Sequence, residues 1–139
     1  MKKIAWIAVI VVTIGIILMR FGMGNQEYSA TDILENANFN VDNQFLNVHS
    51  IDIERENIFE EVEIPLERQH DLIKIFKNAK FIPAESTADH DYRINITLNT
   101  GYAMFLDSKR SSLYVISSEK NYEMKGGEEF FAILNNAEK

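Results

Sequence analysis

An uncharged, almost wholly apolar run near the N-terminus constrains this chain most. The run is IAWIAVIVVTIGIILM, the sixteen residues 4–19, and it follows Met1-Lys2-Lys3. In a helix with a rise of about 1.5 Å per residue it spans about 24 Å, which is short of a hydrocarbon core of about 30 Å. Counting through Gly24 lengthens the segment to about 31 Å, with Arg20 as its only charge, near one end. We therefore expect residues 4–24 to insert into a membrane.

The charges around this run predict its orientation. Lysines precede it and Arg20 follows it, so the positive-inside rule places the N-terminus in the cytoplasm and the bulk of the chain outside. A cleaved signal peptide is the competing interpretation, because Gly22 and Gly24 are small residues at the spacing that a signal peptidase reads. The run is longer than the usual apolar region of about 7–15 residues, which favours an uncleaved signal anchor. The expected location is the cell membrane, as a single-pass protein, with a secreted product as the alternative.

The chain beyond the apolar run has room for one small domain. The 115 residues after residue 24 suffice for a modest core but not for two domains. There is no cysteine, which excludes disulfides and a lipid-modified cysteine. Together with the Lys-, Ile-, Asn- and Glu-rich usage, this is typical of an exported protein of a Gram-positive bacterium. We expect a signal anchor or signal peptide over 1–24, a polar tether over 25–45 and an extracytoplasmic domain over 46–139.

The charge of the chain is unevenly distributed. The first twenty residues hold three basic side chains and no acid, so the remainder carries 11 Lys and Arg against 21 Asp and Glu, a net charge of −10. An acidic domain is a poor partner for nucleic acid, because phosphate affinity comes from cationic side chains. Acidity for solubility is the simplest interpretation, and a cationic partner or a divalent cation is the alternative.

Two periodicities in residues 46–139 predict an α+β domain. LERQHDLIKIFKNA places apolar residues at i, i+3, i+4 and i+7, with acids early and lysines late, as in an amphipathic helix that Pro83 prevents from continuing. YRINITL alternates apolar and polar residues, as in a strand with one buried face. In the preceding tether, Thr31 is expected to cap a short helix. The expected elements are two strands within 46–64 separated by a turn at 55–57, a helix over 66–79, strands over 92–98, 102–106, 113–117 and 122–124, and a helix over 128–137.

The last four predicted strands are joined by short turns, of which Asn99-Thr100-Gly101 is the first. Such connections favour an antiparallel meander over 92–124. Because one face of each strand is apolar, we expect that face to pack against the two helices. The predicted fold is therefore an N-terminal transmembrane helix followed by a small α+β domain, in which an antiparallel β-meander packs against two helices.

Metal-ligating and catalytic patterns are weak in this chain. His49, His70 and His90 are far apart, without the spacing of a zinc site. Asp89-His90-Asp91 is the most metal-like triplet, but it lacks the glycine and the distal glutamate of a calcium loop, so a solvated turn is the favoured interpretation and divalent-cation binding the alternative.

An acidic run is the main source of candidate catalytic carboxylates. It comprises Glu54, Glu56, Glu60, Glu61 and Glu63. Strand alternation places Glu61 and Glu63 on an outward face, so a solvated surface is the favoured interpretation over acid–base chemistry. The sequence also lacks a nucleophile elbow and a glycine-rich phosphate loop. We expect no enzymatic activity, no cofactor and no metal site.

The aromatic residues of the predicted meander suggest a binding surface. Tyr102, Tyr114 and Tyr122 lie on adjacent predicted strands, with Lys109 and Arg110 at a hairpin tip. Aromatic residues on paired strands usually stabilise the sheet. If one sheet face is uncovered, the same residues would form a platform for a peptide or glycan, and the two basic residues would contact a partner. These five residues are the candidate partner-binding surface.

From residue 66 onward, the order of features resembles a known family. A helix ending in LIKIFKNAK, then DYRINITLNTGYAMFLD, LYVIS, a tyrosine-bearing strand and a closing FFAIL helix are similar to the YhfM-like extracytoplasmic domain of small Bacillus-type surface proteins. The resemblance covers roughly residues 64–136. It implies a cell-surface protein of unknown biochemical role and supplies no site residues. Lipid-anchored members have a cysteine that this chain lacks.

The anchor and the absence of reactive motifs together predict a function. We expect a membrane-anchored, non-enzymatic extracytoplasmic domain that binds a protein or peptide of the cell envelope. The alternative is a sensor or regulatory domain that binds a small ligand or a divalent cation.

Overall fold

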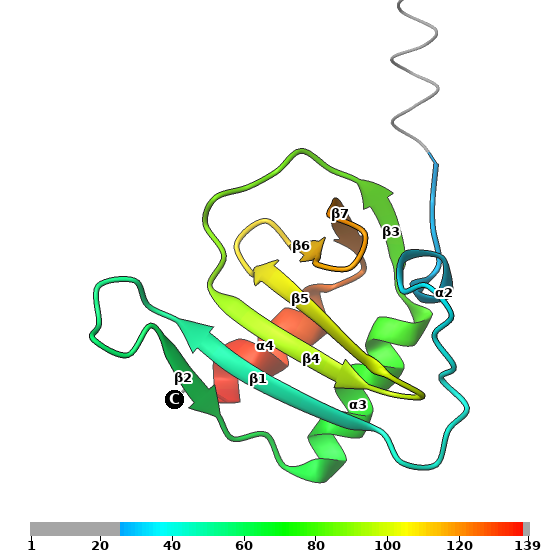
Figure 1. Cartoon of the computed structure of the whole chain (residues 1–139), viewed down its shortest axis with the longest axis horizontal. Coiled ribbons are helices and arrows are strands. Elements are labelled where there is room, and N and C mark those ends of the chain that lie inside the picture. Colours follow the sequence, from blue (N-terminus) through cyan, green and yellow to red (C-terminus); the bar gives the residue numbers. More distant parts are fainter. Residues whose placement is uncertain (1–25, 138–139) are drawn as a thin grey trace, which may run out of the picture.

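The computed structural model describes residues 26–137, which form an α+β fold around a seven-stranded antiparallel sheet (Figure 1). The predicted signal anchor lies outside the described residues, and within residues 26–137 no helix is long and apolar enough to cross a bilayer. The predicted α+β class is confirmed. The elements are α2 (Ala30–Ile33), β1 (Phe45–Ile51), β2 (Phe59–Val62), α3 (Leu66–Asn78), β3 (Lys80–Pro83), β4 (Tyr92–Thr97), β5 (Gly101–Asp107), β6 (Ser112–Val115), β7 (Lys120–Lys125) and α4 (Glu128–Ala137).

The strand order of the sheet is β2-β1-β4-β5-β6-β7-β3. Strands β4 to β7 form the predicted meander, the β1–β2 hairpin joins it along β4, and β3 joins it along β7. Helix α3 leaves β2 at one edge of the sheet and delivers the chain to β3 at the other edge. The segment 84–91 then returns the chain to β4 in the middle. The two edges are therefore connected through the helix layer.

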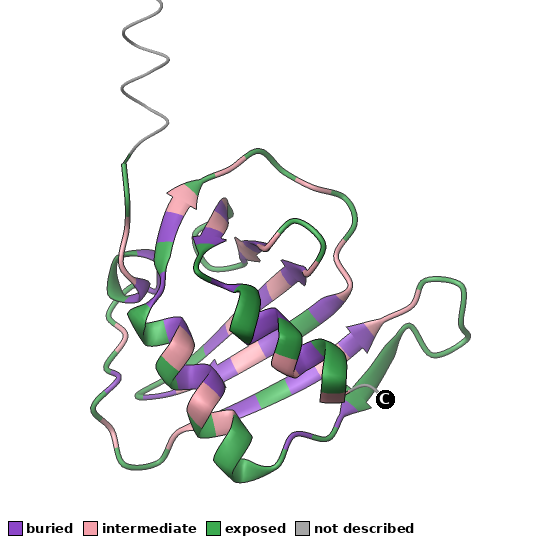
Figure 2. Ribbon diagram, turned by 180° about the vertical axis from the view of Figure 1, so that it is seen from behind, coloured by how far each residue is buried: buried purple, intermediate pink, exposed green. Residues whose placement is uncertain are grey.

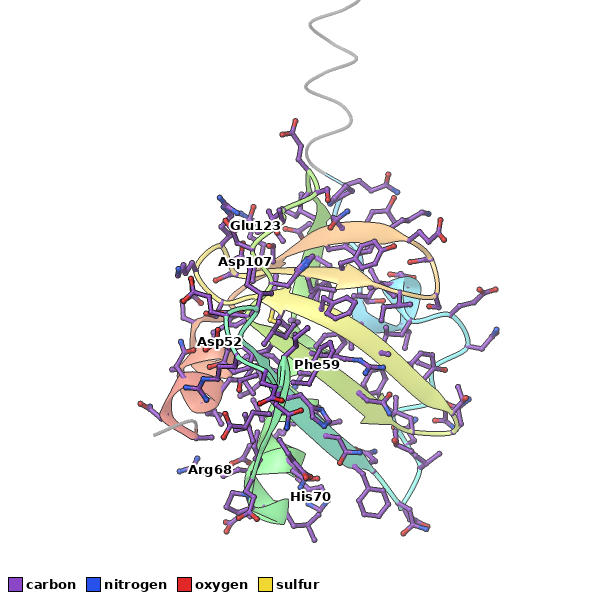
Figure 3. All side chains as sticks on the ribbon, turned by 60° about the vertical axis from the view of Figure 1, so that its left-hand side comes forward. Asp52, Phe59, Arg68, His70, Asp107 and Glu123 are labelled. Atoms are coloured by element: carbon purple, nitrogen blue, oxygen red, sulfur yellow. The ribbon has the colours of Figure 1, made fainter. Side chains whose placement is uncertain are left out.

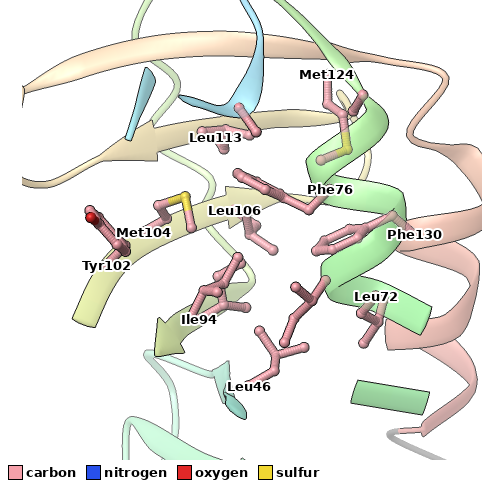
Figure 4. Packing of buried hydrophobic residues seen from close by; sticks show 14 of the residues in the cluster. Leu46, Leu72, Phe76, Ile94, Tyr102, Met104, Leu106, Leu113, Met124 and Phe130 are labelled. Carbon is pink, nitrogen blue, oxygen red and sulfur yellow. The ribbon is translucent and has the colours of Figure 1, made fainter. Parts of the chain in front are cut away.

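Both long helices cover the same face of the sheet, as Figure 2 shows from behind. Leu72, Ile73 and Phe76 of α3 and Phe130 and Leu134 of α4 are buried against apolar side chains of the strands. The ring centroids of Phe76 and Phe130 lie 6.1 Å apart between the helices and the sheet (Figure 4). This cluster is the hydrophobic core. It includes the apolar positions Leu72, Ile73 and Phe76 of the predicted helix 66–79, whereas Leu66 is exposed.

Two elements of the structure were not predicted as they occur. Lys80–Pro83 was not assigned to any element, but it forms β3 and pairs with β7. Within the segment 25–45, which was predicted as a polar tether, residues 28–39 pack against the domain. The backbone of Tyr28 pairs with that of Phe81, with N···O distances of 2.8 and 2.9 Å, and the side chains of Ala30, Ile33, Leu34 and Phe39 are buried.

The short helix α2 is capped by Ser29 and not by Thr31 as predicted. Ser29 and Asp32 form a capping box, in which the Asp32 N–H donates to Ser29 Oγ and the Ser29 N–H donates to the Asp32 carboxylate over 2.7 Å. The Ser29 hydroxyl and then its backbone N–H, both donating to Asp32, hold the pKa of that carboxyl below its usual range. This box fixes the chain where it enters the core.

Gln69 ties helix α3 to the sheet at the point where β1 extends past β2. Its Oε1 accepts from the Leu46 N–H over 3.1 Å, and its Nε2 donates to the Ile64 carbonyl over 2.8 Å. Strand β2 ends at Val62, so it offers Leu46 no ladder partner. The Gln69 side chain thus takes the place of a neighbouring strand beside Leu46, and it gives the Leu46 N–H and the Ile64 carbonyl their hydrogen-bond partner.

A glycine pair makes the turn from β7 into α4. Gly126 has a φ of 70°, a region that L side chains rarely adopt. A Cβ on Gly127 would lie 2.8 Å from Sδ of Met124, which is buried. The pair therefore lets α4 turn back closely over the core.

We predict that Gln69→Ala lowers the free energy of unfolding by about 1–3 kcal/mol, because it leaves the Leu46 N–H and the Ile64 carbonyl without their partner. Chemical denaturation of the two proteins side by side measures this change. His70→Ala is the matched control, since His70 is the exposed neighbour on the same helix. Equal loss in both variants would contradict the assigned role of Gln69.

We predict that Ser29→Ala raises the pKa of Asp32 towards its usual value, whereas Thr31→Ala leaves that pKa lowered. A carboxyl with a lowered folded-state pKa adds stability above its unfolded pKa of about 3.9, and the contribution is lost as the pH falls through the folded value. The end of α2 should therefore lose its cap only when the pH falls low enough to protonate Asp32. NMR titration of the Asp32 carboxyl tests both variants, and an unchanged midpoint in Ser29→Ala would argue against the capping box.

Candidate functional site

The sheet face opposite the helices is uncovered by any helix of residues 26–137 (Figure 1). Strand register places one side chain from each of six neighbouring strands in a single row across this face. We call these residues the open-face row. They are Glu61, His49, Arg93, Phe105, Tyr114 and Asn121. All six are exposed or half-buried, whereas the residues that alternate with them are almost all buried under the helices.

Aromatic and cationic groups meet at the β1–β2 end of the open-face row. The Arg93 guanidinium lies over the ring of Phe59, 5.8 Å from its centroid, an arrangement that a ring quadrupole stabilises. Phe59 pairs with Ile51 across the hairpin and keeps 43% of its surface exposed (Figure 3). This end of the face therefore offers both an apolar surface and a charge.

His90 packs onto the middle of the open-face row. Its ring centroid lies 5.5 Å from that of Phe105 and 6.4 Å from that of Tyr114. The segment 84–91 is held at the ends of the strands, because the Asp91 N–H donates to the Leu106 carbonyl and the Ala84 N–H donates to the Asn121 carbonyl. His90 thus extends the aromatic surface above the plane of the sheet.

Only one of the three predicted tyrosines belongs to this face. Tyr114 lies in the open-face row, but Tyr102 and Tyr122 are buried on the helix-covered side, at 6% and 5% exposure. Figure 4 shows Tyr102 among the core side chains. The Tyr102 hydroxyl donates to the Glu35 carbonyl over 3.1 Å. Tyr122 packs edge-on against Tyr28, and its burial raises the pKa of its phenol. The three tyrosines therefore do not form the single surface that was predicted.

The predicted basic residues lie in the β5–β6 turn. Lys109 is exposed, and its backbone N–H donates to Asp107 Oδ1 over 3.1 Å. The Arg110 guanidinium forms ion pairs with Asp107 at 3.1 Å and with Asp89 at 3.5 Å. Arg110 is thus engaged with carboxylates of its own chain, and Lys109 remains the more available charge.

The structure separates the three side chains of the predicted metal-like triplet. Asp89 pairs with Arg110, His90 stacks on Phe105, and the Asp91 carboxylate accepts from both the N–H and the hydroxyl of Ser108. Nowhere in residues 26–137 do three or more His, Cys, Asp or Glu side chains gather closely enough to hold a metal ion.

The acidic run occupies the β1–β2 hairpin and strand β2. Its glutamates are exposed, as predicted, and Arg55 at the tip pairs with Asp52 at 2.9 Å and with Glu60 at 2.6 Å. Exposed apolar side chains lie among these charges, with Ile53 83% and Ile58 45% exposed. Phe59 and Arg93 were not among the predicted site residues, and His49 was considered only as a metal ligand. The alternation of their strands was a signal that these side chains lie on the outward face.

An open hollow of about 540 Å³ lies between the segment 84–89 and the ends of β6 and β7. Ser112 lines it and is flanked in register by Asp107 and Glu123. Ser112 is 6% exposed, and its Oγ has no hydrogen-bond partner among the described residues. Glu123 accepts from Lys125 Nζ over 2.8 Å, which raises the pKa of that lysine.

Comparisons with family models, with curated proteins and with solved structures found no match to this chain.

We predict that calcium or manganese leaves the thermal unfolding midpoint unchanged. The Asp91 carboxylate already accepts hydrogen bonds from Ser108, and Asp89 already forms an ion pair with Arg110. A cation that selects the native state would raise that midpoint. Sodium chloride at equal ionic strength is the control. A cation-dependent rise that Asp89→Asn or Asp91→Asn removes would contradict this prediction.

Proposed function

We propose that this chain is a membrane-anchored, non-enzymatic binding module whose extracytoplasmic domain binds a protein or peptide of the cell envelope through its open sheet face. The observation that carries the proposal is the open-face row with Phe59 and His90 beside it. These side chains combine aromatic area, a guanidinium and two imidazoles on a rigid sheet. Aromatic residues and arginine are enriched where proteins bind one another.

The rigidity of the surface supports binding through it. Each residue of the open-face row is held by a strand whose opposite side is buried in the core. A surface that is already ordered loses little conformational freedom when a partner binds. The predicted anchor over residues 4–24, with the N-terminus in the cytoplasm, would hold this surface close to the membrane. The resemblance to the YhfM-like domain agrees with such a placement.

The hollow beneath the segment 84–89 favours the alternative function, a sensor domain that binds a small ligand. Its lining includes the Ser112 hydroxyl and the Arg110 guanidinium beside carboxylates. A polar ligand would gain hydrogen bonds there. The open face is the stronger candidate because it presents aromatic side chains and a guanidinium together, as protein interfaces often do.

We predict that a photoreactive benzoylphenylalanine at position 105 or 114 of the full-length chain cross-links to an envelope component in intact cells. The same group in place of Lys74 is the matched control, because Lys74 is exposed on α3, on the other side of the sheet. Mass spectrometry of the adducts identifies the component. Adducts at all three positions alike, or at none of them, would count against the open face as the binding surface.

A further inference from the structure

We propose that the free edge of β2 accepts an extended, basic segment of a partner protein as an eighth strand of the sheet. This inference rests on the proposed function and names the class of partner. The open face would contact the side chains of that segment, while the edge would bind its backbone. Addition of a strand to an exposed sheet edge is a common mode of peptide recognition.

The register of the hairpin shows which backbone groups are available. The Asp52 N–H donates to the Ile58 carbonyl over 3.0 Å, and antiparallel pairs alternate between bonded and non-bonded. The pairs of β1 with Glu60 and Val62 are therefore the bonded ones. The N–H and C=O groups of Phe59 and Glu61 point away from β1, to the outer edge of the sheet.

The two edges of the sheet differ in how they are covered. At β3 the backbone of Tyr28 bonds to that of Phe81 in both directions. At β2 the strand order ends, and the described residues add no such pairing. The edge of β2 is thus the one at which residues 26–137 leave a row of backbone donors and acceptors free.

The side chains along this edge combine apolar surface with negative charge. Phe59 and Ile58 are 43% and 45% exposed. Residues 52–63 contain six acids and one base, Arg55, so their net charge is −5. Arg55 already pairs with Asp52 and Glu60. Glu61 and Glu63 have no ion-pair partner among the described residues.

The negative charge of residues 52–63 favours a partner segment with basic side chains. Two copies of β2 placed edge to edge would bring their glutamates together, and this repulsion opposes self-association. A segment with lysine or arginine at alternate positions would instead place its charges against Glu61 and Glu63. A hollow of about 390 Å³ bordered by Asn47, Glu61 and Glu63 lies at the end of β2 and has room for a long basic side chain.

The test uses the full-length chain in detergent and a short fluorescent peptide that alternates valine with lysine. Three measurements by fluorescence anisotropy separate backbone pairing from simple charge attraction. The first compares this peptide with its fully N-methylated analogue, which keeps the lysine charges but has no N–H to donate. The second compares the double variant Glu61→Gln, Glu63→Gln with Glu67→Gln, an exposed glutamate on α3. The third uses Glu61→Pro, which removes an outward N–H without breaking a bond to β1.

We expect the unmodified peptide to bind and the N-methylated analogue to bind at least about tenfold more weakly. The loss of even one hydrogen bond lowers the affinity by about that factor. The double variant and Glu61→Pro should weaken binding, and Glu67→Gln should not. Equal binding of the two peptides would overturn strand addition, as would no binding of either. If Glu61→Pro fails to fold, the peptide comparison alone decides. The cross-linking test at positions 105 and 114 is independent, so the proposed function would survive the failure of this inference.

Discussion

The rest of the structure depends on the burial of one sheet face beneath α3 and α4. Phe76 and Phe130 lie at the centre of this contact, and both are fully buried. Because α3 also carries the chain from one edge of the sheet to the other, its packing positions the β1–β2 hairpin and strand β3 at opposite ends of the meander. Burial of apolar area is the dominant favourable term in folding, so a single layer of helices suffices to order all seven strands.

One-sided burial has a direct consequence for function. An antiparallel sheet with one packed face leaves the other to be filled by polar and aromatic side chains. Here the register aligns Arg93, Phe105 and Tyr114 in one row, and the chain returning from β3 adds His90. The two edges carry a similar asymmetry. The backbone of Tyr28 covers β3 at Phe81, whereas β2 carries glutamates and its outer backbone groups have no strand partner within residues 26–137.

Much of the secondary structure was predictable because local patterns encode it. The alternation of residues 92–98 and the helical spacing of residues 66–79 correspond to β4 and α3. The first two turns of the meander occur where they were predicted, and the third lies two residues earlier, at 116–119. Strand β3 was missed because a four-residue strand that ends in Pro83 shows no periodicity of its own. It becomes a strand through its pairing with β7. The burial of Ala30, Ile33 and Leu34 was not predicted for a similar reason, since these apolar side chains are buried only in a core built by distant segments.

The candidate binding surface was likewise predictable from the sequence only in part. The sequence by itself determined that exposed glutamates follow the β1–β2 turn, that the meander has one apolar face, and that a hairpin tip carries Lys109 and Arg110. Only the tertiary structure decided that Tyr102 and Tyr122 face the core while Tyr114 faces outward. The physical reason is strand register: a shift of one residue moves every side chain of a strand to the other face. That register depends on pairing with neighbouring strands and on helices from elsewhere in the chain, which local patterns do not specify.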